Sequence, residues 1–164
     1  MRVELLSITP NTERIAGEAA AICTRSDDPD RSLRAAMGSG HDSVLEHISF
    51  TFRIDGVSRV LLAQLTRHRL ASFSVESQRY SGAPDPAHNT VIPPSVVQHG
   101  YAGRVEHEMI RIAEMYLEMV ANGVPEEDAR YFMPQGIVTN LIMTVNAREL
   151  GHILSLRCCR RAQW

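Results

Sequence analysis

The chain has 164 residues, of which 44% are hydrophobic and 22% are charged, and its formal net charge is −2. This composition predicts a globular protein with its own hydrophobic core and argues against long disordered or membrane-spanning segments. The slightly negative charge argues against binding of bulk nucleic acid, because surfaces that bind a duplex are strongly basic.

A strand followed by a helix is predicted at the N-terminus. The apolar segment 1–9 favours a short strand, and we expect the helix to run to about Thr24. Thr9 offers a capping hydroxyl, Pro10 suits the first helical position, and Glu13 places an acid near the positive end of the helix.

The next stretch is predicted to contain two helical segments, a strand and a further helix. We expect a helix over 30–37, closed by glycines, and a helical turn over 43–47. Residues 48–55 alternate apolar and polar side chains, as in a half-buried strand, and Gly56 is expected to end it. The apolar segment 57–67 predicts a buried helix, which would bring Gln64 and Arg67 together on one face.

The second half is predicted to begin with an irregular loop at 81–94, where prolines are frequent. A long amphipathic helix follows over 95–121, with a methionine-rich stripe that is expected to face the core or a subunit interface. A further helix opens at Pro125, a strand covers 137–145, and a final helix runs over 146–157. No repeat or linker divides the sequence, so one domain is expected.

Arginine is concentrated in the segment 67–80. Arg67, His68 and Arg69 are followed by Ser77 and Arg79, with Glu76 as the one opposing charge. A guanidinium can hold phosphate oxygens through paired, charge-assisted hydrogen bonds, and a hydroxyl can complete the shell. The segment therefore predicts a site for phosphate or another polyanion, although a solvated basic loop would have the same composition.

All seventeen basic residues are arginines. The lack of lysine excludes a Schiff base, a P-loop lysine and a kinase-type lysine. The three cysteines, Cys23, Cys158 and Cys159, provide no disulfide framework, and the N-terminus has no signal-peptide pattern. These features predict a cytoplasmic protein.

Several motifs together resemble the flavin-dependent thymidylate synthases. The main one is RHRLASFSVESQRY at 67–80, which contains Arg-His-Arg, seven residues and then a serine. GHDSVLEH at 40–47, the segment 125–134, TVNAREL at 144–150 and LSLRCCRRAQW at 154–164 occur in the same order as in that family. The resemblance covers most of the chain, from about residue 40 to its last residue.

The resemblance implies a mixed α/β (α+β) fold with an antiparallel sheet and packed helices, acting as a single catalytic domain over 1–164. The family's further C-terminal helices are expected to be missing. The resemblance also implies a homotetramer with sites shared between subunits, FAD as cofactor, and conversion of dUMP to dTMP with methylenetetrahydrofolate and NADPH as co-substrates. An alternative is a noncatalytic relic that binds flavin or nucleotide, and an Arg-rich RNA-binding module is a third possibility, opposed by the low aromatic content.

The resemblance also assigns roles to individual residues. Arg157 is expected to activate the uracil, and His41 to act near the folate during methylene transfer. The residues expected to bind FAD are Ser43, Arg67, His68, Arg69, Val75, Asn146, Ala147, Arg148 and His152. The residues expected to bind dUMP are Gln64, Leu65, Thr66, Arg67, Val75, Glu76, Ser77, Gln78, Arg79, Arg130 and Arg157.

Val75, Ser77 and the two adjacent cysteines bear on these expected roles. Val75 stands where the family usually has Glu or Gln, so a polar contact is lost or is made by Glu76. Ser77 could be read as a nucleophile, but it lacks a recognisable base beside it, and binding is the preferred role. Cys158 and Cys159 have no surroundings that indicate attack on the base, and no His spacing indicates a metal site, so no metal is expected.

Overall fold

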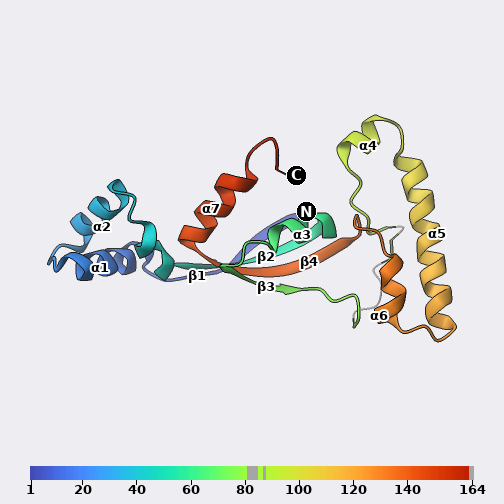
Figure 1. Ribbon diagram of the computed structural model, residues 1–164, viewed down its shortest axis with the longest axis horizontal. Coiled ribbons are helices and arrows are strands. Elements are labelled where there is room, and N and C mark those ends of the chain that lie inside the picture. The colour runs from blue at the N-terminus through green and yellow to red at the C-terminus, as the bar shows by residue number, and fades with distance from the viewer. Residues whose placement is uncertain (81–84, 87, 163–164) are drawn as a thin grey trace. The chain divides into compact units, whose positions relative to one another are not determined.

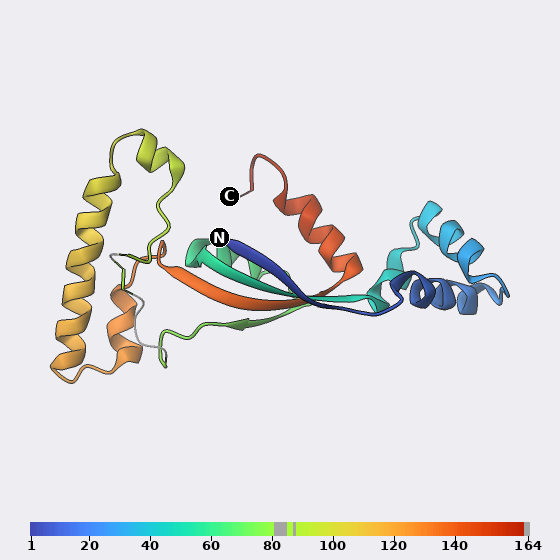
Figure 2. The ribbon, with the colours of Figure 1, turned by 180° about the vertical axis from the view of Figure 1, so that it is seen from behind.

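A computed structural model describes residues 1–80, 85–86 and 88–162 (Figures 1 and 2). Four strands form one sheet with the order β1-β2-β4-β3. The strands are β1 (Arg2–Ile8), β2 (Ser49–Ser58), β3 (Ala71–Val75) and β4 (Val138–Asn146). The helices are α1 (Thr12–Thr24), α2 (Pro29–Gly38), α3 (Arg59–Leu65), α4 (Pro94–Gln98), α5 (Ala102–Ala121), α6 (Glu126–Ala129) and α7 (Ala147–Arg157), with 3-10 helices η1 (Asp42–His47) and η2 (Arg130–Phe132). The expected α+β fold is confirmed.

The chain divides into two compact units. The first, called the helix-hairpin unit here after α5 and α6, comprises 1–2, 54–65 and 75–141, and the second, called the α7 unit, comprises 3–53, 66–74 and 142–164. Both contribute segments to the sheet.

In the α7 unit, small residues allow α1 and α2 to pack closely. Ala16, Ala20 and Ala21 are buried on one face of α1. A Cβ atom at Gly17 would lie 3.1 Å from the carbonyl oxygen of Pro29, so a larger residue would push α2 away. Figures 1 and 2 both show α1 and α2 side by side. The η1 segment contacts α1, α2 and α7, which ties the start of α7 to these helices.

In the helix-hairpin unit, α5 packs beside α6 and η2. Tyr116 is the buried residue of α5, and Ala129 at the end of α6 is fully buried. The half-buried side chains of α5 follow the apolar stripe that the sequence predicts. Among the described residues, no helix is long and apolar enough to cross a membrane.

The predicted start of the first helix was wrong by two residues. The helix begins at Thr12, after Asn11 in the left-handed conformation with φ of 53°, and Pro10 lies outside it. The Thr9 hydroxyl accepts a hydrogen bond from the Ser49 N–H at 2.9 Å instead of capping the helix. Thr9 therefore joins the end of β1 to the start of β2.

The predicted end of the strand at Gly56 was also wrong, because β2 continues to Ser58. Gly56 has a φ of +72°, which a glycine tolerates without strain, and its N–H donates to the Asn140 side chain at 3.0 Å. The next helix is consequently shorter than 57–67. It spans Arg59–Leu65, contains no fully buried residue, and leaves Arg67 beyond its end.

The remaining differences concern β3 and the long helix. Ala71–Val75 forms a strand that was not predicted, because it lies within the motif segment that we interpreted as a binding loop. The helix expected over 95–121 is divided into α4 and α5 around Gly100, whose φ is +76°. The loop expected at 81–94 falls partly outside the described residues, but Thr90 forms a bridge with Ile137. The turn at 43–47 and the elements beginning at 30, 125, 137 and 146 are confirmed to within about two residues.

Asn140 of β4 is expected to stabilise the sheet by linking β2 to the residue that follows β3. Its side chain accepts from Gly56 N–H at 3.0 Å and donates to the Glu76 carboxylate at 2.7 Å. Asn140→Ala would leave both groups without this partner and should lower the free energy of unfolding by about 1–3 kcal/mol. Urea unfolding measures this change. Asn122→Ala, at the exposed end of α5, serves as the control, and an equally small effect of both substitutions would contradict the linking role.

Candidate functional site

The α7 unit contains a buried histidine held between an acid and an arginine. His68 is 6% exposed, and its Nδ1 lies 3.1 Å from Oε1 of Glu149, whose side chain is 8% exposed. On the other side of the ring, Arg157 Nε donates to His68 Nε2 at 3.2 Å. The acid and the arginine both come from α7, about two turns apart, so a single helix supplies both partners of the imidazole.

The start of α7 explains why these groups lie where they do. Asn146 is the N-cap residue, and its side chain accepts from the Glu149 N–H at 2.8 Å. The N–H of Ala147 donates to the Ile48 carbonyl at 2.8 Å, which fixes the first turn against the segment before β2. The Glu149 carboxylate lies in the first turn, where the helix dipole favours negative charge.

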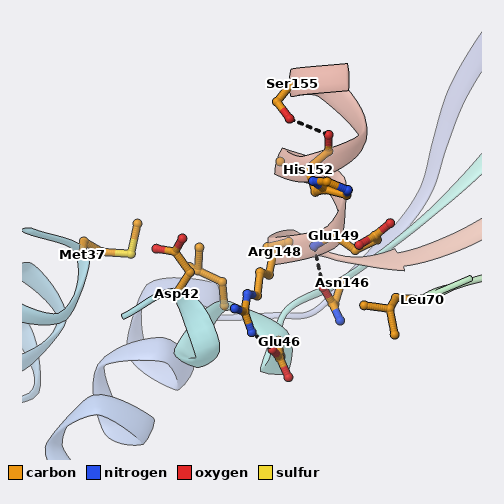
Figure 3. A pocket seen from close by; sticks show the side chains of 12 residues that line it. Met37, Asp42, Glu46, Leu70, Asn146, Arg148, Glu149, His152 and Ser155 are labelled. Carbon is orange, nitrogen blue, oxygen red and sulfur yellow. Dashed lines mark hydrogen bonds and ion pairs between the residues drawn. The ribbon is translucent and has the colours of Figure 1, made fainter. Parts of the chain in front are cut away.

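A pocket of about 680 Å³ opens beside this first turn (Figure 3). Figure 3 shows Arg148 directed toward Glu46 of η1, and the two side chains form an ion pair. Of the residues expected to bind FAD, Asn146, Ala147, Arg148 and His152 line this pocket. The His152 ring also stands edge-on to His68, with ring centroids 6.0 Å apart.

A second pocket, of about 580 Å³, lies among α1, α2 and η1. It is lined by His41 and Ser43, the two site residues expected near Gly40, and Arg148 lines it as well. The structure thus brings His41 and Ser43 to the same guanidinium that borders the first pocket.

The helix-hairpin unit holds a cluster of arginines around one glutamate. Arg79 forms an ion pair with the Glu127 carboxylate, and Arg130 Nε donates to the Glu127 carbonyl at 3.1 Å. The Ser77 hydroxyl accepts from the Arg79 N–H at 3.1 Å. Arg79 and Arg130 are separated widely in sequence, yet both are oriented by the same residue of α6.

The charge of Arg59 interacts with the charges of Arg130 and Glu76. Burial and the positive charge of Arg130 lower the pKa of Arg59, while the negative charge of Glu76 opposes this effect. Like-charged guanidiniums in a partly buried place repel each other unless an anion joins them, so the cluster is suited to bind phosphate. Nearby in sequence, the Gln78 side chain has a buried amide nitrogen without a hydrogen-bond partner in the described chain.

The expected site residues therefore fall into two sets. The α7 unit contains His41, Ser43, Thr66, Arg67, His68, Arg69, Asn146, Ala147, Arg148, His152 and Arg157. The helix-hairpin unit contains Gln64, Leu65, Val75, Glu76, Ser77, Gln78, Arg79 and Arg130. Arg67 and Arg69 are exposed on either side of the buried His68. Within 1–80, 85–86 and 88–162, no group of His, Cys, Asp and Glu side chains is arranged to hold a metal ion.

Sequence reasoning missed three residues of these clusters. Glu149 was quoted within a motif but given no role, and its only signal was its place in the first turn of the last helix. Glu127 has the sequence position of an ordinary acid at the start of a helix. Arg59 stands in an apolar helical segment, and nothing there indicated a role for its charge. The side-chain partners of Glu149 and Glu127, which are His68 and Arg79, are distant in sequence, so the pattern alone could not identify these residues.

The sequence model of the family described as "Thymidylate synthase complementing protein" matches residues 4–164. A flavin-dependent thymidylate synthase of Geobacter sulfurreducens is 43% identical over 177 residues, which cover 100% of this chain and 76% of that protein. The chain belongs to the flavin-dependent thymidylate synthase family. The resemblance inferred from the motifs is thereby confirmed.

Other members of the flavin-dependent thymidylate synthase family support the assignment. The enzyme of that name from Sulfolobus acidocaldarius is 38% identical over 178 residues, covering 100% of this chain and 67% of that protein. A crystal structure of thymidylate synthase X from Helicobacter pylori with FAD and dUMP superposes with a TM-score of 0.80 at 28% identity. The match covers 99% of this chain and 86% of that one, so the fold is that of the family.

The arginine cluster of the helix-hairpin unit should bind inorganic phosphate. Phosphate should raise the melting temperature of the wild-type protein, because a ligand that binds the folded state stabilises it. Arg130→Met should reduce that rise, since it removes one guanidinium of the cluster. Thermal unfolding in phosphate, compared with chloride of equal ionic strength, measures the effect. Arg104→Met, on an exposed position of α5, is the control, and an equal rise in both variants would contradict the assignment.

Proposed function

We propose that this protein converts dUMP to dTMP, using methylenetetrahydrofolate as the one-carbon donor and NADPH as the reductant through bound FAD. The observation that carries the proposal is the match over 99% of the chain to a thymidylate synthase whose crystal structure contains FAD and dUMP. The curated relatives, which carry the name flavin-dependent thymidylate synthase, support the same reaction.

The chain's own residues fit a flavin nucleotide. The pocket beside α7 presents a guanidinium, an amide and an imidazole, from Arg148, Asn146 and His152, which suits an anionic and hydrogen-bonding ligand. Arg148 is paired with Glu46 at a half-exposed place, and a pair of this kind is weak enough to be exchanged for a phosphate. We assign FAD binding to Ser43, Arg67, His68, Arg69, Val75, Asn146, Ala147, Arg148 and His152. When bound and reduced by NADPH, the flavin would supply the hydride for the pyrimidine.

The cluster of the helix-hairpin unit fits the phosphate of dUMP. Glu127 orients Arg79 and Arg130, and Ser77 adds a hydroxyl beside the Arg79 backbone. We assign dUMP binding to Gln64, Leu65, Thr66, Arg67, Val75, Glu76, Ser77, Gln78, Arg79, Arg130 and Arg157. Arg59 is a further candidate on the basis of its lowered pKa and its closeness to Arg130.

Arg157 is proposed to activate the uracil ring. A fixed guanidinium stabilises negative charge on the pyrimidine, which favours a polarised ring without a covalent bond to the protein. Ser77 then acts in binding and not as a nucleophile. His41, which lines the second pocket with Ser43, is proposed to act near the folate during methylene transfer.

The assembly is also a proposal. We infer a cytoplasmic homotetramer with sites shared between subunits, in which residues 1–164 act as one catalytic domain. All residues of β1 are exposed, among them Val3, Leu5, Leu6 and Ile8 with exposed fractions of 57%, 50%, 47% and 44%. Apolar side chains exposed along a whole edge strand support burial against another subunit.

Purified protein should carry a flavin spectrum and form dTMP from dUMP only when methylenetetrahydrofolate and NADPH are both present.

Arg157→Ala should lower kcat by about a hundredfold to a thousandfold, because it removes a preorganised stabiliser of developing charge. Flavin affinity, measured by fluorescence titration, should change far less. Arg104→Ala is the matched control.

Two outcomes of this assay would contradict the proposal. Flavin binding without dTMP formation by the wild-type protein would favour a noncatalytic relic of the same fold. Equal losses of turnover and flavin affinity in Arg157→Ala would contradict the role given to Arg157.

A further inference from the structure

We propose that Glu149 is a positioning residue for the reaction: through His68 it sets the orientation of Arg157. This inference rests on the proposed function, in which Arg157 acts on the uracil, and it adds a residue for which the motifs gave no role. The proposed chain of contacts is Glu149 carboxylate, His68 imidazole and Arg157 guanidinium, all within the α7 unit.

The direction of the hydrogen bonds follows from the chemistry of arginine. A guanidinium has only N–H donors, so Arg157 Nε donates and His68 Nε2 must accept, at 3.2 Å. An imidazole whose Nε2 accepts carries its proton on Nδ1. That Nδ1–H points to Glu149 Oε1 at 3.1 Å, and the carboxylate accepts it. Glu149 therefore selects the neutral tautomer of His68 that can hold Arg157.

The hydrogen bond uses only one edge of the arginine. Fixing Nε against a buried ring restrains the position and the plane of the guanidinium. In the proposed reaction the terminal groups Nη1 and Nη2 stabilise charge on the pyrimidine. A small loss of orientation at such a group reduces the rate strongly, because the geometry of the reacting groups is part of catalysis.

The Glu149 carboxylate does not bond within the first turn of α7, as a glutamate at this position commonly does. Glu149 is the third residue after the N-cap Asn146, where a glutamate commonly turns back to the N-cap backbone N–H in a capping box. Here the carboxylate bonds to His68 and is buried, although burying a carboxylate is costly unless it is paired. The Asn146 side chain accepts from the Glu149 N–H, which is one half of such a box, while the Glu149 carboxylate is used for the imidazole.

Arg148 and Glu149, which are neighbours in α7, have different partners. Figure 3 shows Arg148 and Glu149 leaving the first turn in different directions, Arg148 toward Glu46. Arg148 lines the two pockets described above, while Glu149 lines the first of them and bonds through its carboxylate to the buried ring. The edge-on His152 packs against the same ring and limits its rotation.

Kinetics of two variants test the proposal. Glu149→Met keeps a side chain of similar volume but removes the acceptor, and kcat should fall about tenfold to a hundredfold. Glu149→Gln keeps a carbonyl oxygen that can accept from Nδ1–H, and it should restore most of the activity. In Glu149→Met, kcat should fall by a larger factor than the dUMP KM rises, because Arg157 is one of several residues assigned to dUMP binding. Glu106→Met, on an exposed position of α5, is the control.

The tautomer of His68 in the wild-type protein provides a second test, which does not depend on a measurement of activity. In the wild-type protein with uniformly ¹⁵N-labelled histidine, NMR should show a protonated Nδ1 and an unprotonated Nε2 for His68. The signal is assigned by its absence in His68→Gln. A proton on Nε2 in the wild-type protein would overturn the proposal.

The outcomes separate this proposal from the function on which it rests. A wild-type protein that forms no dTMP contradicts the proposed function, whatever the tautomer. An active wild-type protein whose Glu149→Met variant keeps full kcat contradicts the positioning role alone. Equal losses of kcat in Glu149→Met and Glu149→Gln would also overturn it, because the role requires an acceptor and not a charge.

Discussion

The candidate site depends on one buried imidazole whose two nitrogens have different partners. His68 belongs to the Arg-His-Arg motif, but unlike the flanking Arg67 and Arg69 it is buried. A buried polar ring must have its hydrogen bonds satisfied, and here α7 provides an acceptor at Nδ1 and a donor at Nε2. This pairing joins His68 of the motif to the first turn of α7 through Glu149 and to the last residue of α7, Arg157.

The absence of lysine has a structural counterpart in how the arginines are held. Arg79 and Arg130 are oriented by Glu127, Arg148 is paired with Glu46, and Arg157 bonds to His68. A guanidinium is planar, so a partner on one edge fixes the direction of the others, which an ammonium could not provide. The arginines are thus oriented cations, as the recognition of phosphates and of an anionic pyrimidine requires.

The parts of the fold that depend on local sequence could be predicted. The N-cap Asn146 and the start of α7 follow from side chains that act within one turn, and the alternation over 48–55 indicates the strand that β2 forms. Gly56 was misread because a glycine with positive φ can continue a strand when a distant side chain, Asn140, satisfies its N–H. The motif gives Arg67 and Arg69 an expected role in binding but gives none to Glu149, since nothing near Glu149 in sequence indicates that its partner is His68.

A crystal structure of the wild-type protein with FAD and dUMP is the most direct test of the central claim, that a buried acid and imidazole orient the arginine that acts on the uracil. The account predicts that a terminal nitrogen of Arg157 contacts the uracil ring while its Nε still donates to His68 Nε2, and that Glu149 still accepts from Nδ1. An Arg157 side chain turned away from the nucleotide, or a His68 ring separated from Glu149 in the complex, would contradict it.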